Sequence, residues 1–228
     1  MTSAPMQARP ATVRAMGGFV PYAVISVVHV GALAIGAHAI AGPTKLLLMP
    51  ALALAVLWTA RPLAAGRTLV LLLAAIGLSW LGDGAATFFP FLPELPVMLA
   101  CFGLAHLAYI WLFARELPTR SLPRWTAVYL VWWVVLLAVL WPHLGALTVA
   151  VALYGIVLAG TAATAARTDA VITWGAVFFL TSDTLLAFRI FTPDALPEWA
   201  GAPVMLTYTL GQGLIAAGVV RARRRRVS

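Results

Sequence analysis

The sequence predicts an all-α, polytopic membrane protein with eight transmembrane helices and both termini in the cytoplasm. Of its 228 residues, 63% are hydrophobic and only 10% are charged, and the mean hydropathy is +0.98, whereas soluble domains are about half apolar. The apolar residues gather into runs of roughly 20 residues, the length that crosses a bilayer as a helix. All but two of the 15 basic residues fall at the chain ends or in alternate connections, which is typical of cytoplasmic segments.

The first four runs have clear boundaries. Run 19–40 follows Arg9 and Arg14, and it is too long for the core of a cleaved signal peptide. We expect it to end at a turn formed by Ala-Gly-Pro at 41–43, before the second run, 45–58. A basic loop follows, and the third and fourth runs, on either side of a proline-rich loop, cover residues 68–89 and 97–113.

The last four runs follow the same alternation of charge. They cover residues 125–141, rich in tryptophan that we expect at the membrane interface, and then 144–166, 170–191 and 201–220. We therefore divide the chain into an amino-terminal cytoplasmic segment (1–18), a transmembrane domain (19–220) and a basic cytoplasmic tail (221–228).

Charge and cysteine content exclude several other classes of protein. The formal net charge is +8, but the basic residues fall at helix ends, where they would face anionic lipid, so nucleic-acid binding is not expected. The single cysteine, Cys101, excludes an intramolecular disulfide and a cysteine-based metal cluster. Low lysine with abundant alanine, glycine and arginine suggests a bacterial source, and so an inner-membrane location.

Two aspartates, Asp83 and Asp183, lie inside apolar runs, where a charge is costly and calls for a function. With the predicted topology, they lie roughly 24 and 20 Å from the cytoplasmic ends of their helices, in the outer half of the membrane. Lys45 and Arg189 are the two basic residues that break the charge pattern, and both are expected near the outer end. These four residues could share one cavity open to the outer side.

Other polar residues are spaced to share helix faces with the aspartates. Ser79 lies four residues before Asp83, and His106 and Tyr109 lie on one stripe of the fourth run. The candidate substrate-binding residues are Lys45, Ser79, His106, Tyr109, Ser182, Arg189, Tyr208 and Gln212. For Lys45 and Arg189, the alternative is a side chain that only reaches the membrane interface, and for His106 it is a hydrogen-bonded packing role.

The two aspartates have the chemistry of a general acid and a general base. Two carboxylates in a poorly solvated pocket do not both ionise easily, which leaves a protonated acid beside an ionised base. The alternative is that each is a packing residue paired with a hydroxyl or with Arg189. No ligand spacing predicts a metal, and no nucleophile elbow or glycine-rich loop predicts a serine hydrolase or a cofactor.

Four segments together resemble the YhhN family, in order and spacing over most of the chain. They are Thr44-Lys45 with Leu48-Met49-Pro50, Ser79-x-x-Gly82-Asp83, Phe102-Gly103-Leu104-x-His106-Leu107-x-Tyr109-Ile110, and Phe179-x-x-Ser182-Asp183-x-Leu185-Leu186-Ala187. Leu46 departs from the family pattern, which commonly has proline after the lysine.

The resemblance implies an eight-helix enzyme of the lysoplasmalogenase type, which hydrolyses the vinyl ether bond of lysoplasmalogens. It implies that Asp83 and Asp183 are catalytic, and it matches the histidine and lysine positions of the family to His106 and Lys45. The expected partners are a lysophospholipid and the surrounding membrane lipids, with no cofactor. The two aspartate segments are weakly similar to each other, as an internal duplication would produce, so a transporter remains an alternative function. A hydrolase of another lysolipid and a lipid-binding protein without catalysis also remain alternatives.

Overall fold

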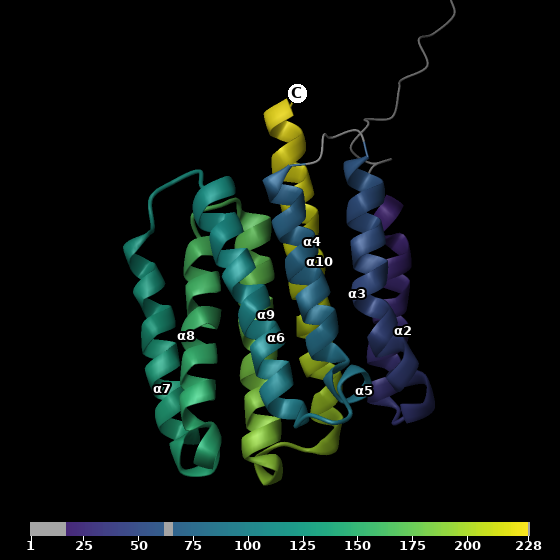
Figure 1. Ribbon diagram of the computed structural model, residues 1–228, viewed down its shortest axis with the longest axis vertical. Coiled ribbons are helices and arrows are strands. Elements are labelled where there is room, and N and C mark those ends of the chain that lie inside the picture. The colour runs from purple at the N-terminus through teal and green to yellow at the C-terminus, as the bar shows by residue number, and fades with distance from the viewer. Residues whose placement is uncertain (1–16, 62–65, 228) are drawn as a thin grey trace, which may run out of the picture.

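The computed structural model describes residues 17–61 and 66–227, and all regular secondary structure in these ranges is helical (Figure 1). The eight long helices in them are α2 (Val20–Ala34), α3 (His38–Ala60), α4 (Arg67–Asp83), α6 (Glu94–Trp111), α7 (Ala127–Leu144), α8 (Thr148–Ala165), α9 (Ala170–Phe191) and α10 (Gly201–Val227). Short helices complete the chain: α5 (Ala85–Phe88), the π-helical η2 (Leu112–Glu116), and the 3₁₀ turns η1 (Gly17–Phe19), η3 (Arg124–Thr126), η4 (Gly145–Leu147), η5 (Pro193–Ala195) and η6 (Glu198–Ala200).

The helices make this an integral, multi-pass membrane protein. In the described ranges, six helical segments are long and apolar enough to cross a membrane, and one of them, Arg124–Ala165, contains both α7 and α8. Large apolar side chains such as Val27, Val131 and Leu153 are exposed on the surface, as expected for contact with lipid. Helix α4 has 17 residues and is not among the six segments. Membrane crossing by all eight helices and cytoplasmic termini stay predictions, and residues 1–16 of the predicted amino-terminal segment lie outside the described residues.

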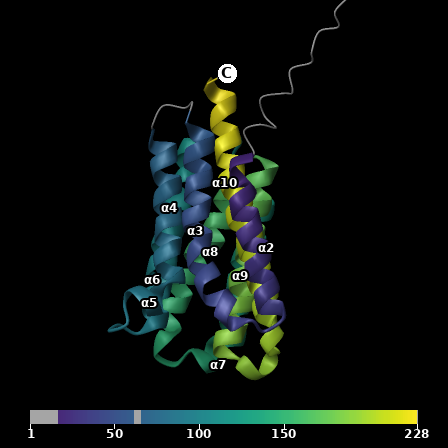
Figure 2. The ribbon, with the colours of Figure 1, turned by 90° about the vertical axis from the view of Figure 1, so that its right-hand side faces the viewer.

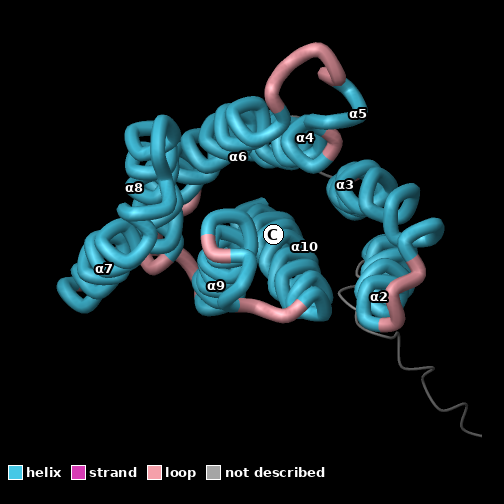
Figure 3. The backbone as a smooth tube through the Cα atoms, turned by 90° about the horizontal axis from the view of Figure 1, so that it is seen from below, coloured by secondary structure: helices cyan, strands magenta, loops and turns pink. Residues whose placement is uncertain are grey.

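Helices α9 and α10 form the centre of the bundle. Viewed along the helices, the other six form an arc around this pair, in the order α7, α8, α6, α4, α3 and α2 (Figure 3; side view in Figure 2). Gly175 and Gly211 let the two central backbones touch, because a Cβ atom on Gly211 would lie 2.8 Å from the backbone nitrogen of Phe179. Small residues at such contacts permit close helix packing in membranes. This contact fixes α9 against α10, and so Asp183 relative to Tyr208.

The first turn differs from the prediction of a turn at 41–43. The chain reverses between α2 and α3, at Gly36, whose φ of +70° is in the left-handed region that favours glycine. Pro43 lies inside α3, and the Thr44 hydroxyl donates to the carbonyl of Ile40 at 2.7 Å. The prediction was wrong because a membrane helix can continue through a proline, so the Ala-Gly-Pro composition does not by itself end the helix.

The predicted third span, 68–89, is broken into α4 and α5 at Gly84. Asp83 is therefore the last residue of α4 rather than a residue within a continuous helix. A Cβ atom on Gly84 would lie 2.3 Å from the ring of Phe88, so the chain folds back tightly after Asp83. The break places the Asp83 carboxylate at the end of the helix.

Of the predicted basic tail, 221–228, residues 221–227 continue α10 as a helix, and residue 228 lies outside the described residues. The Arg221 guanidinium lies 2.9 Å from the carboxylate of Asp169, at the beginning of α9. Arg224 donates to the backbone carbonyl of Thr59, near the end of α3. The end of α10 thus ties together helices that are distant in sequence.

Candidate active site

A cavity of about 530 Å³ opens at the end of the bundle where α4 and α9 finish and α6 and α10 begin. Side chains from six helices line it, and both aspartates are among them. The lining includes these predicted site residues: Lys45, Asp83, Ser182, Asp183, Arg189 and Tyr208. Acidic groups on two different helices therefore face one space, which is large enough for a ligand of moderate size.

Asp83 is held by a tyrosine and a lysine from two other helices. The Tyr208 hydroxyl of α10 donates to Asp83 Oδ2 at 2.7 Å, and Lys45 Nζ of α3 lies 4.0 Å from Asp83 Oδ1. The Asp83 side chain is only 5% exposed, and that of Lys45 is 38% exposed. The ammonium group offsets part of the cost of a carboxylate at this depth.

The position of Lys45 depends on a proline one turn further along α3. Pro50 lacks an N–H group, so the carbonyl of Leu46 loses its helical partner. The Trp80 indole of α4 donates to this carbonyl at 2.9 Å. The bond ties α3 to α4 beside both Lys45 and Asp83.

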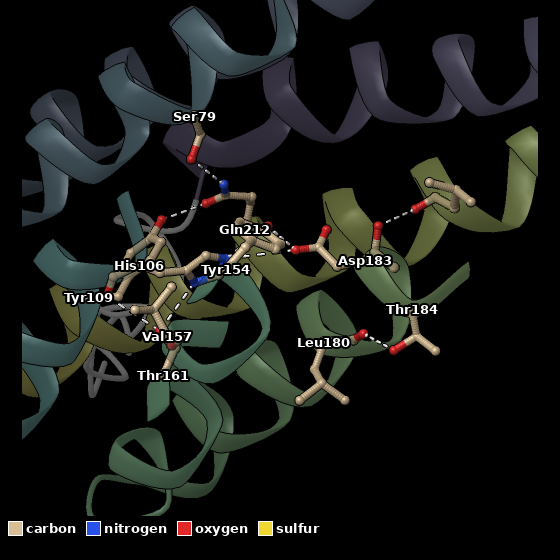
Figure 4. A network of polar contacts seen from close by, with 12 residues as sticks. Ser79, His106, Tyr109, Tyr154, Val157, Thr161, Leu180, Asp183, Thr184 and Gln212 are labelled. Atoms are coloured by element: carbon tan, nitrogen blue, oxygen red, sulfur yellow. Dashed lines mark hydrogen bonds and ion pairs between the residues drawn. The ribbon is translucent and has the colours of Figure 1, made fainter. Parts of the chain in front are cut away.

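Asp183 has a different set of partners, a tyrosine and a histidine. The Tyr154 hydroxyl of α8 donates to Asp183 Oδ2 in a short hydrogen bond (Figure 4). His106 Nε2 of α6 lies 3.7 Å from the same oxygen and 3.3 Å from the Tyr154 hydroxyl. No cation comparable to Lys45 is paired with Asp183 in the described residues.

His106 is fully buried behind Asp183 and is not one of the residues that line the cavity. Its Nδ1 lies 3.1 Å from Thr161 Oγ1, and the Thr161 hydroxyl can donate to the carbonyl of Val157 at 3.0 Å. Nδ1 therefore donates to Thr161, and Nε2 faces Asp183. The Tyr154 hydroxyl, within hydrogen-bonding distance of both, links His106 Nε2 and the Asp183 carboxyl into one polar cluster beside the cavity.

Three predicted substrate contacts, Ser79, Tyr109 and Gln212, lie beneath the cavity and bond to one another. The Tyr109 hydroxyl donates to Gln212 Oε1 at 2.6 Å, and Gln212 Nε2 donates to Ser79 Oγ at 3.0 Å (Figure 4). All three side chains are buried and are not among the lining residues of the cavity. The structure therefore places them where they hold α4, α6 and α10 together, instead of on the cavity wall.

Ser182 and Arg189 lie on the wall in different ways. The Ser182 hydroxyl donates to the carbonyl of Val204 at 2.9 Å and is occupied in fixing α9 to α10. The guanidinium of Arg189 lies against Gly201, where a Cβ atom would come within 2.9 Å of it. Together with Lys45, Arg189 gives the cavity two cationic groups, and Glu94, at the beginning of α6, adds an acidic one that the sequence analysis did not identify.

Tyr154 is the main functional residue that sequence reasoning missed. It lies in an apolar helix, α8, where a phenol needs a polar partner, and that requirement was the available signal. Its partner is separated from it by 29 residues, and no local spacing predicts the pairing.

For metals, the described residues contain no group of three or more His, Cys, Asp or Glu side chains placed to hold an ion.

These features define a polytopic helical membrane protein with a two-aspartate cavity between its helices. The chain belongs to the YhhN family, whose model matches residues 41–219. The match covers α3 to most of α10, and with them both aspartates, Lys45 and His106. It supports a lysoplasmalogenase-like membrane protein at the level of the family. No curated protein and no solved structure matches the chain.

Proposed function

We propose that the protein is a hydrolase that cleaves the vinyl ether bond of lysoplasmalogens. The products are a fatty aldehyde and glycerophosphoethanolamine or glycerophosphocholine. The observation that carries the proposal is that Asp83 and Asp183 face one cavity with different partners, one cationic and one neutral. Vinyl ethers are hydrolysed by acid catalysis, which needs a proton donor and a group that stabilises a cation.

In the proposed orientation, all eight long helices cross the bilayer, both termini are cytoplasmic and the cavity lies in the outer half. The single-chain lipid enters sideways from the bilayer. Its phosphate lies near Lys45 and Arg189, the two cationic groups of the cavity wall, because charge-assisted hydrogen bonds to phosphate are strong.

The two aspartates have separate roles. Asp83, paired with the Lys45 ammonium, is the ionised group. Asp183 carries the proton, because its neighbours are a phenol and an imidazole that can share one proton with it. Tyr154 and His106 position Asp183 and stabilise its conjugate base after the proton has left.

The reaction begins when Asp183 transfers its proton to the vinyl carbon that is not bonded to the ether oxygen and that bears the alkyl chain. This carbon forms a C–H bond with the double-bond electrons, and an oxocarbenium ion results, which the Asp83 carboxylate stabilises. Water adds to the cationic carbon and gives up a proton to the Asp183 carboxylate. The hemiacetal then collapses: Asp183 donates the proton that it took from water to the departing glycerol oxygen, and the C–O bond breaks. The hemiacetal hydroxyl returns its proton to Asp183, so the aldehyde and the alcohol leave and the acid is regenerated.

The proposal is tested by incubating the purified protein with 1-alkenyl lysophosphatidylethanolamine and following aldehyde release by mass spectrometry. The Asp83→Asn and Asp183→Asn variants keep the side-chain shape but lose the acid function, and we expect each to reduce the rate by about 10²–10⁴-fold, the usual contribution of acid–base groups. Asp194→Asn is the matched control, because Asp194 is exposed in η5 and lies outside the cavity lining.

Two results would contradict the proposal. If the parent protein binds the lipid and returns it unaltered, a binding protein is favoured. If sealed vesicles show movement of a solute without chemical change, a transporter is favoured. Aldehyde release that persists in both aspartate variants would remove the two carboxylates from the mechanism.

A further inference from the structure

Two narrow cavities adjoin the main cavity at Asp183. The first, of about 50 Å³, lies among α6, α8 and α9, and the second, of about 40 Å³, lies among α7, α8 and α9. Asp183 lines all three cavities. Leu186 and Ile190 line both the main and the first narrow cavity, and Val151 and Ala187 line both narrow ones. The three spaces therefore adjoin one another at Asp183.

The residues that line these cavities change from polar to apolar at Asp183. Lys45, Asp83 and Arg189 line the main cavity only. Beyond Asp183 and Tyr154, the side chains that line the first narrow cavity are apolar. We call this part the tail crevice, and we define it by five residues: Leu99, Val151, Tyr154, Leu186 and Ala187.

We propose that the tail crevice binds the first methylene groups of the alkenyl chain of the substrate, directly beyond the vinyl ether. This inference rests on the proposed function. The crevice is too small for a whole fatty chain, so the remainder must leave it toward the bilayer.

The chemistry of the reaction favours this placement. The vinyl carbon that must receive the proton is the carbon that bears the alkyl chain, and the ether oxygen leads to the head group. A chain that enters the crevice at Asp183 therefore brings the reacting carbon to the acid. The head group then lies toward Lys45 and Arg189, the cationic groups of the main cavity.

The crevice contributes orientation more than affinity. A lipid chain in the bilayer is already in apolar surroundings, so moving it between helices gains little hydrophobic energy. A chain held in a narrow space, however, fixes the rotation of the double bond relative to Asp183. A misplacement of about 1 Å can cost about 10²-fold in rate.

A second apolar groove on the molecule does not provide this geometry. It has a volume of about 590 Å³ and lies between α2 and α10, with Tyr22, Val30 and Leu210 among its lining. Neither aspartate lines it. A chain bound there would leave the vinyl ether away from the proposed acid.

The first test fills the crevice and varies the chain. Val151→Trp narrows it, and Leu153→Trp, which adds the same side chain on the lipid-facing surface of α8, is the matched control. Each is assayed with long-chain 1-alkenyl lysophosphatidylethanolamine and with its 1-propenyl analogue, whose chain ends one carbon beyond the double bond. We expect Val151→Trp to lower kcat/KM for the long chain by at least about tenfold, with less than about a twofold change for the propenyl substrate and for the control.

A second test locates the chain without turnover. A 1-alkyl lysophosphatidylethanolamine with a photoreactive diazirine on its first methylene groups resists hydrolysis, and its label is mapped by peptide mass spectrometry. We expect label on α8 and α9, near Val151 and Ala187. Label on α2 and α10 would overturn the inference.

The outcomes separate this inference from the proposed function. If the parent releases aldehyde but Val151→Trp affects both chain lengths equally, the tail crevice is wrong and the hydrolase stands. If the parent releases no aldehyde from either substrate, the proposed function fails, and the tail assignment fails with it.

Discussion

Removal of the Tyr154 hydroxyl tests the central geometry of the site most directly. Tyr154→Phe deletes the donor to Asp183 and leaves the ring that packs near His106. A hydrogen bond to a charged group contributes about 1.5–3 kcal/mol. The Asp183 side chain is only 9% exposed, so water cannot replace the lost donor well. If the bond stabilises the carboxylate formed on proton transfer, kcat should fall by about 10- to 150-fold.

The assay is aldehyde release under saturating lipid, with kcat and KM determined separately. Because Tyr154 acts on the acid, the loss should appear mainly in kcat, which is the sign of an interaction made in the transition state. Tyr129→Phe is the matched control, since Tyr129 is buried in α7 and is outside the main cavity. A Tyr154→Phe enzyme with kcat within twofold of the parent, and the same thermal stability, would refute the assignment of Asp183 as the proton donor held by Tyr154.

Three further predictions concern binding and stability. Lys45→Met should raise KM for the lysophospholipid by about tenfold, the scale of one lost charge-assisted bond; an unchanged KM would leave Lys45 as an interfacial side chain. Gly211→Val should lower the unfolding free energy in detergent by at least about 1–3 kcal/mol, because its side chain would meet the backbone of Phe179; a change below about 0.5 kcal/mol would contradict the contact. Arg221→Gln should cost less than about 1 kcal/mol in the same measurement, since its ion pair with Asp169 is 42% exposed on the arginine side; a larger loss would mean that the pair anchors the bundle.

The aspartate pair was predictable from sequence because a charge inside a long apolar run is conspicuous by itself. The residues around the pair were only partly predictable. Ser79 shares a helix face with Asp83, but it lies one turn deeper, and it bonds to Gln212 below the cavity. Helical spacing predicts which residues share a face, but it does not predict how far along the helix the cavity reaches.

Two other features depended on distant contacts or local backbone detail. Tyr154 meets Asp183 across helices, and a lone tyrosine in an apolar run does not reveal its partner. The residues at 41–43 have the composition of a turn, yet the Thr44 hydroxyl bonds to the carbonyl of Ile40 beside Pro43, and the reversal falls at Gly36. The hydrophobic pattern alone shows neither the partner of Tyr154 nor the position of the chain reversal.

The central position of α9 and α10 has a consequence for how the protein is made. These two helices come late in the chain, so the ribosome delivers the six helices of the arc to the membrane before the pair that fills it. During that interval, Asp83 lacks Tyr208, and Tyr109 lacks Gln212. The early helices must keep these polar groups away from lipid, through water or a membrane insertase, until the last hairpin arrives. Biogenesis therefore depends on α9 and α10, and a chain interrupted before them would carry unpaired polar groups that membrane quality control can recognise.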